Sequence, residues 1–112
     1  MERIMAAFNN SLNGFLSVYE QEKSFREDIL IFILFFPLAI FSETVVLEKA
    51  LLVSSLFIIL MAELINTAIE VIIDRISKET HELSKVAKDI GSGLVLLSFI
   101  NAALIWGFIF FG

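Results

Sequence analysis

The chain has 112 residues, 58% of them apolar, and it contains no cysteine. Soluble domains average about 45–50% apolar, and a chain this small has too much surface for its volume to bury the excess hydrocarbon. A small soluble domain is therefore a poor interpretation, disulfide frameworks and thiolate metal sites are excluded, and the net charge of −5 does not suggest a nucleic-acid partner.

Residues 1–20 predict an amphipathic helix. Apolar side chains recur there at spacings of three and four, and three asparagines lie on the opposite side. The apolar positions are Ile4, Phe8, Leu12, Phe15, Leu16 and Tyr19. Beside membrane-spanning segments, such a helix is expected to lie in the plane of the membrane interface. Packing against a soluble partner is the alternative.

Three later stretches of the chain carry little or no charge. A helix needs about 20 apolar residues to cross a bilayer, and these runs are continuous rather than alternating, which favours helices over a β-barrel. Pro37 is expected to kink the first of them. The sequence thus predicts one all-α membrane domain over residues 1–112, with three transmembrane helices at about 25–46, about 50–73 and about 90–112.

The basic residues indicate an orientation. The N-terminal segment contains three Lys or Arg residues, the loop between the first two spans one, the loop between the last two spans four, and the C-terminal end none. The positive-inside rule then places the N-terminus and the loop at residues 74–89 in the cytoplasm. This alternation fits an odd number of spans.

The second span carries an acidic stripe made of Glu63, Asn66, Glu70 and Asp74. These residues follow one another at i, i+3, i+7 and i+11, so at about 100° per residue they share one helix face. A carboxylate at the centre of a bilayer costs roughly 2.5–3.5 kcal/mol. The stripe is therefore expected to face protein, water or an ion. A buried hydrogen-bonded pair that only holds helices together is the simpler alternative.

Carboxylates on such a stripe suit two tasks. They bind a hard cation, usually Mg²⁺ together with phosphate, or one of them acts as a base. Glu63 lies deepest and is expected to take a proton near a lipid headgroup, whereas Glu70 is expected to hold metal. Lys88 is expected to contact phosphate, with membrane anchoring as the alternative. The Gly-Ser-Gly run at 91–93 is no phosphate-binding loop and is expected to let helices approach closely.

Several motifs resemble those of the bacterial integral-membrane diacylglycerol kinase family. The run ELINTAIEVIIDR begins at Glu63, HELS begins at His81, and AKDIGS begins at Ala87. Upstream, EKSFRED begins at Glu22. The pattern E-x-x-N-[ST]-A-I-E-x-x-x-D followed by A-K-D is highly specific, and the resemblance covers nearly the whole chain.

The resemblance implies a homotrimer of three-span subunits in the bacterial inner membrane, each with an interfacial helix. It also implies transfer of the γ-phosphoryl group of MgATP to the hydroxyl of diacylglycerol, with Mg²⁺ as cofactor and ATP as co-substrate. By the same resemblance, Glu63 is the catalytic base, and Glu22 and Glu70 are the metal ligands.

The resemblance assigns the other site residues as well. The implied contacts to the nucleotide are Arg3, Asn10, Glu22, Glu70, Glu79, His81, Lys88 and Asp89. The implied supporting residues are Arg26, Asp28, Asn66 and Asp74. Contact with the lipid substrate is expected from Glu63, Ser92 and Trp106.

Three alternatives stay open at this point. An undecaprenol kinase would share the fold, although the loop at His81 and the Gly-Ser-Gly run favour diacylglycerol. A small cation- or proton-coupled transporter would also place carboxylates in the membrane, but three spans contain no inverted repeat. A non-catalytic membrane scaffold would leave the buried acids unexplained.

Overall fold

The computed structural model describes residues 1–76 and 82–112 of the chain. Every secondary-structure element in these residues is an α-helix, which confirms the all-α prediction. The helices are α1 (Glu2–Gln21), α2 (Lys23–Ile40), α3 (Val46–Ile76) and α4 (Glu82–Phe111).

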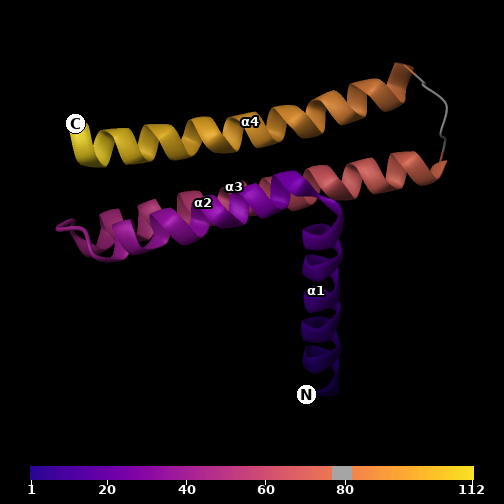
Figure 1. Ribbon diagram of the computed structural model, residues 1–112, viewed down its shortest axis with the longest axis horizontal. Helices are drawn as coiled ribbons and strands as arrows, with labels where there is room; N and C mark the ends of the chain where they lie inside the picture. The colour runs from indigo at the N-terminus through magenta and orange to yellow at the C-terminus, as the bar shows by residue number, and fades with distance from the viewer. Residues whose placement is uncertain (77–81) are drawn as a thin grey trace.

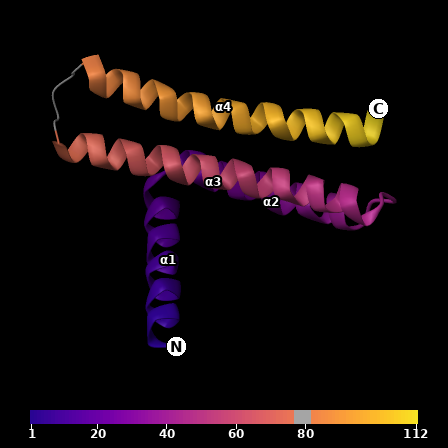
Figure 2. The ribbon, with the colours of Figure 1, turned by 180° about the vertical axis from the view of Figure 1, so that it is seen from behind.

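The last three helices run side by side, and each is antiparallel to the one before it (Figure 1). The central helix, α3, packs against both α2 and α4. α1 projects from the start of α2 away from the other three helices and crosses their common direction, and the view from behind shows the same arrangement (Figure 2). This geometry is what an interfacial helix beside membrane-spanning helices requires.

A single extended residue, Glu22, separates α1 from α2. Its backbone angles, φ −115° and ψ 111°, interrupt the helix and turn the chain. The guanidinium of Arg26 then donates hydrogen bonds to the carbonyl oxygens of Tyr19 and Glu20, at 2.7 and 3.2 Å. Those carbonyls lie at the end of a helix and lack helical partners. Arg26 therefore caps α1 and fixes the corner.

Two helices, α3 and α4, are each long and apolar enough to cross a membrane. They contain the second and third predicted spans, and most of the apolar surface of α4 is left uncovered by the rest of the chain. Within the described ranges, no other helix is both long enough and apolar enough to cross a membrane. α2 has 18 residues and carries its charges in the first half, and it ends at Ile40, with Pro37 in its last turn. The first span at about 25–46 stays a prediction.

The core lies along α3, where small and branched side chains pack between the helices. Leu52 and Ala39 are fully buried between α3 and α2, and Phe32 of α2 contacts Phe57 of α3 edge to face at 4.8 Å between ring centroids. At the end of the bundle distant from α1, Trp106 of α4 contacts Phe35 of α2 in the same way. Elsewhere the three helices expose large apolar side chains, as membrane helices do.

Candidate functional site

The acidic stripe of α3 turns inward, not outward. Glu63 is 5% exposed, Asn66 is 9% exposed, and Glu70 is half-buried, whereas Asp74 near the end of the helix is exposed. The stripe therefore runs from the buried carboxylate of Glu63 to the exposed Asp74, at the end of the bundle that we call the polar end. A charged group is costly to bury without a partner, so the environment of Glu63 decides what the stripe can do.

Glu63 lies against the first turns of α2, because α2 packs along α3. Ser24 interacts with Glu63, and the charges of Glu22 and Glu70 act on the same carboxylate. Asp28, 6% exposed, interacts electrostatically with Glu63, and its Oδ2 atom has no hydrogen-bond partner among the described residues. We call Glu22, Asp28, Glu63 and Glu70 the acidic cluster.

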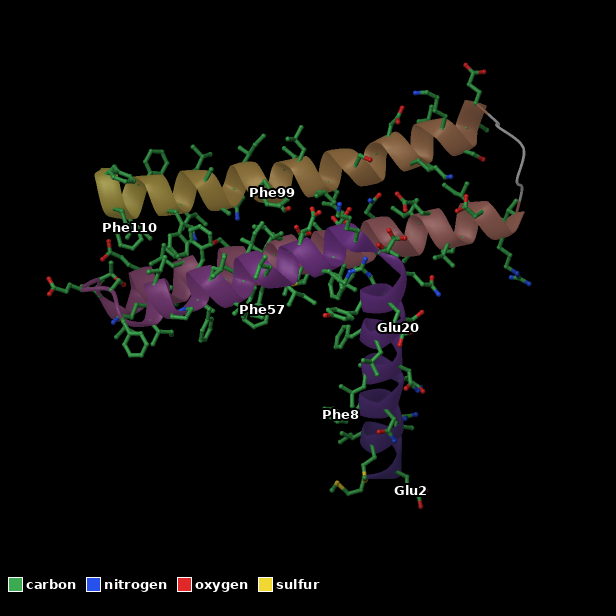
Figure 3. All side chains as sticks on the ribbon, viewed as in Figure 1. Glu2, Phe8, Glu20, Phe57, Phe99 and Phe110 are labelled. Carbon is green, nitrogen blue, oxygen red and sulfur yellow. The ribbon has the colours of Figure 1, made fainter. Side chains whose placement is uncertain are left out.

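The acidic cluster lies near the corner at which Glu22 joins α1 to α2, since Glu22, Asp28 and Glu70 all act on Glu63. Figure 3 shows polar side-chain atoms at this corner and mostly carbon around Phe57. Like charges held this close repel one another unless a proton or a cation intervenes. The arrangement thus suits either a carboxylate that takes up a proton or a pair of carboxylates that bind a cation.

Asn66 connects two parts of the stripe. Its Nδ2 atom donates a hydrogen bond to Oε1 of Glu70 at 3.4 Å, and its buried Oδ1 atom has no hydrogen-bond partner in the described part of the chain. The amide therefore holds one carboxylate oxygen of Glu70 and leaves the other available. In the supporting role predicted for it, Asn66 would hold Glu70 in place through this hydrogen bond.

Lys88 and Asp89 lie on α4, at the same end of the bundle as Asp74 of α3. Lys88 Nζ donates a 2.8 Å hydrogen bond to Oδ1 of Asp74, which links α4 to α3, and Lys85 Nζ donates one of 2.7 Å to Oδ2 of Asp89. Both ion pairs are largely exposed. Exposed pairs contribute only about 0–1 kcal/mol, so Lys88 can exchange its carboxylate for a phosphate oxygen at little cost.

An apolar groove adjoins the acidic cluster. It has a volume of about 440 Å³ and is lined by side chains of α1, α2 and α3, among them Leu16, Phe25 and Leu64. Phe25 and Leu64 directly follow Ser24 and Glu63 in the chain, so the groove lies along the same turns of α2 and α3 as the buried carboxylate, although Glu63 is not part of its lining. The inward face of α1, which includes Phe8, turns towards this side (Figure 3). The same turns of α3 thus carry a buried acid and part of a surface for hydrocarbon chains.

The sequence profile of the family described as prokaryotic diacylglycerol kinase matches residues 9–110. The chain belongs to the prokaryotic diacylglycerol kinase family. The diacylglycerol kinase of Haemophilus influenzae is 37% identical over 101 residues, which cover 90% of this chain and 86% of that protein. The diacylglycerol kinase of Pseudomonas aeruginosa is 36% identical over 112 residues, 100% of this chain and 91% of that protein. The diacylglycerol kinase of Escherichia coli K12 is 36% identical over 104 residues, which cover 93% of this chain and 85% of that protein.

Membership of the prokaryotic diacylglycerol kinase family confirms the prediction of an enzyme, a kinase of lipid metabolism with transmembrane helices. Kinases of this family imply ATP as co-substrate. The transporter and scaffold interpretations therefore lose their support. The comparisons concern the family and leave the role of each site residue as a prediction.

Other predicted site residues of this family member lie apart from the acidic cluster. Arg3 and Asn10 are exposed on α1, and Arg3 lies about 28 Å along the helix from Glu22, at about 1.5 Å per residue. Ser92 is exposed on α4, although the preceding Gly91 packs against Asn66 of the stripe. Trp106 donates a hydrogen bond to Ser55, two turns of α3 away from Glu63. Two further predicted nucleotide contacts, Glu79 and His81, lie outside the described residues.

The structure adds residues that the sequence interpretation did not single out. Thr67 is 6% exposed, and its position four residues after Glu63 already placed it on the same helix face. Ser24 partners Glu63 from another helix, so no local spacing could reveal it. The same holds for Ser55, which is fully buried and accepts the hydrogen bond from Trp106.

Magnesium binding by this diacylglycerol kinase family member stays a prediction, and the chemistry of two carboxylates is compatible with it. Within residues 1–76 and 82–112, no group of three or more His, Cys, Asp or Glu side chains forms a cage for a metal ion. Mg²⁺ does not require such a cage, because one or two carboxylates plus substrate phosphates usually hold it. Glu22 and Glu70 supply hard oxygen donors of that kind, and the half-buried Glu70 opens towards the polar end.

Proposed function

We propose that the protein transfers the γ-phosphoryl group of MgATP to the hydroxyl of diacylglycerol and so forms phosphatidic acid. One observation carries the proposal: α3 buries the carboxylate of Glu63 on the turns that also line an apolar groove, and it carries Glu70 on the same face two turns nearer to the Lys88–Asp74 pair. The family and its relatives named diacylglycerol kinase support the choice of lipid.

Glu63 acts as the general base in this proposal. Its carboxylate takes the proton of the lipid hydroxyl, the freed oxygen pair attacks the γ-phosphorus, and the bond to the β–γ bridging oxygen breaks as ADP leaves. Ser24, which interacts with Glu63, would orient the carboxylate. Because the groove begins at Phe25 and Leu64, it would hold acyl chains with the hydroxyl close to Glu63.

Glu70 and Glu22 hold the nucleotide end. These two carboxylates would hold a Mg²⁺ ion, which would supply positive charge to the phosphates of the nucleotide. Glu70 lies seven residues after Glu63, about 10 Å along the helix axis at about 1.5 Å per residue. That separation lets base and metal ligand address opposite sides of the transferring group, while Lys88 exchanges Asp74 for a phosphate oxygen.

The proposal includes an assembly and an orientation. Arg3 and Asn10 lie far from the acidic cluster of their own chain, and α4 leaves most of its apolar surface uncovered, which supports a homotrimer whose subunits complete one another's sites. α2, as the first of three spans, would place the N-terminus and residues 74–89 in the cytoplasm, with the protein in the bacterial inner membrane.

The test is a purified-protein assay in detergent micelles with γ-labelled ATP. We expect label to enter diacylglycerol in the presence of Mg²⁺, and no transfer after chelation of the metal. A parallel reaction contains undecaprenol in place of diacylglycerol. Faster transfer to undecaprenol would overturn the assigned substrate, and absence of transfer to either lipid would overturn the proposed function.

A further inference from the structure

Gly91 of α4 lies where α3 and α4 come closest at the stripe. Gly91 is buried, and a Cβ atom built at this position would overlap the carboxamide oxygen Oδ1 of Asn66 and come within 3.2 Å of its Cγ. Gly93, two residues further along α4, differs: a Cβ there would meet no atom of another described helix within 4 Å. The space beside Gly91 is therefore occupied by one particular side chain.

That side chain is the one that holds Glu70. With Oδ1 turned towards Gly91, Asn66 directs Nδ2 to Oε1 of Glu70. The reverse orientation of the amide would bring its oxygen against a carboxylate, which repels it. Oδ1 has no hydrogen-bond partner among the described residues and occupies the space that a side chain at position 91 would fill, so this orientation requires glycine there.

We propose that Gly91 is a positioning residue for the kinase site: its missing side chain leaves space on α4 for the Asn66 carboxamide, which in turn fixes the Glu70 carboxylate. The proposal rests on the proposed function, in which Glu70 holds the metal of the nucleotide. It predicts that a single added methyl group, without removal of any polar atom, weakens metal and nucleotide binding.

Gly91→Ala and Gly93→Ala form a matched pair. Both add one methyl group to the same helix, and alanine favours a helix over glycine at either site. Any difference between the two variants therefore reports the contact with Asn66. Groups that orient metal ligands typically affect metal affinity 10- to 100-fold, so we expect Gly91→Ala to weaken it by roughly 10-fold and Gly93→Ala to leave it unchanged.

Two measurements test the proposal. The first is the binding of Mn²⁺ by electron paramagnetic resonance, with a non-hydrolysable ATP analogue and the full-length protein in micelles. The second is the dependence of diacylglycerol phosphorylation on MgATP. We expect Gly91→Ala to raise the Kd for Mn²⁺ and the KM for MgATP while kcat at saturation stays near the starting value.

The double variant Gly91→Ala/Asn66→Ala tests the route through Asn66. Because the truncated side chain no longer meets the added methyl group, the double variant is expected to match Asn66→Ala alone. Should Gly91→Ala fail to fold, the double variant is expected to restore the helical fold. Failure of the double variant to do so would overturn the proposal.

Further outcomes would also overturn it: equal Mn²⁺ affinity in the two glycine variants, or independent, additive losses from Gly91→Ala and Asn66→Ala. Failure of the proposed function looks different. In that case the unaltered protein transfers no phosphate to diacylglycerol, and the Mn²⁺ comparison between Gly91→Ala and Gly93→Ala still decides whether Gly91 positions the carboxylate.

Discussion

Trp106 on α4 donates a hydrogen bond from its indole nitrogen to the Ser55 hydroxyl on α3, with 3.0 Å between the two atoms. The same hydroxyl donates to the carbonyl oxygen of Leu52 at 2.7 Å. Ser55 is fully buried, so this pair joins the two longest helices away from the acidic cluster. Hydrogen bonds between membrane helices contribute about 0.5–2 kcal/mol.

Replacing Trp106 by Phe should therefore lower the free energy of unfolding by about 0.5–2 kcal/mol, since the ring contacts with Phe35 and Phe110 can persist. Unfolding in micelles, followed by circular dichroism, measures the loss. Ser55→Ala removes the same bond from the other side, so the double variant Ser55→Ala/Trp106→Phe should lose little more than either single variant. Fully additive losses would show that the bond contributes nothing.

Glu63→Gln should reduce turnover of diacylglycerol by about 10²- to 10⁴-fold, because the amide cannot accept the hydroxyl proton as a base. Nucleotide affinity should stay unchanged, since Glu70 and Lys88 are intact. Steady-state kinetics and binding of a fluorescent ATP analogue measure the two effects separately. Glu43→Gln, at an exposed position in the connection before α3, is the control and should leave both unchanged. Normal turnover in Glu63→Gln would remove Glu63 from the role of base.

Lys88→Ala should raise the KM for ATP by about 10-fold or more, as expected for loss of a hydrogen bond to a charged group. Its effect on kcat should be smaller, because the base and the metal ligand remain. The comparison is with Lys49→Ala, a basic residue near the start of α3, at the opposite end of the bundle. If both variants keep the original KM, Lys88 only pairs with Asp74 and anchors α4.

Leu16→Trp should raise the KM for long-chain diacylglycerol by about 5-fold, because a larger ring in the groove overpacks it by about 1 kcal/mol or more. The KM for ATP should not change. Ile4→Trp places the same ring on the same apolar face of α1 but outside the lining of the groove, and serves as the control. Equal effects of the two substitutions on lipid kinetics would indicate a general disturbance of α1 at the membrane surface.

The helical architecture could be predicted from the sequence because charge is so unevenly distributed. The length of the uncharged run after Asp89 predicts a membrane helix. The spacing of Glu63, Asn66 and Glu70 predicts that they share one face of a helix. The inward direction of the stripe also follows from the cost of exposing carboxylates to lipid. The limits of α2 did not follow: its helix ends at Ile40, and hydropathy alone does not say where a helix stops.

The contacts between helices lay beyond the reach of sequence patterns. Ser24 meets Glu63 because α2 packs along α3, and no local spacing reveals which residues of the two helices then face each other. The small residues at 91–93 were expected to permit close packing, but nothing in their spacing distinguishes Gly91 from Gly93. That distinction depends on how α4 is rotated against α3, which is a property of the packed pair.

The missing side chain at position 91 also constrains how related sequences can diverge. A chain that acquires alanine or serine there has room for it only if position 66 shrinks or its side chain takes another rotamer. The two positions, 25 residues apart in the sequence, should therefore substitute together. Lineages with a larger residue at 91 should need another hydrogen-bond donor for the carboxylate at 70.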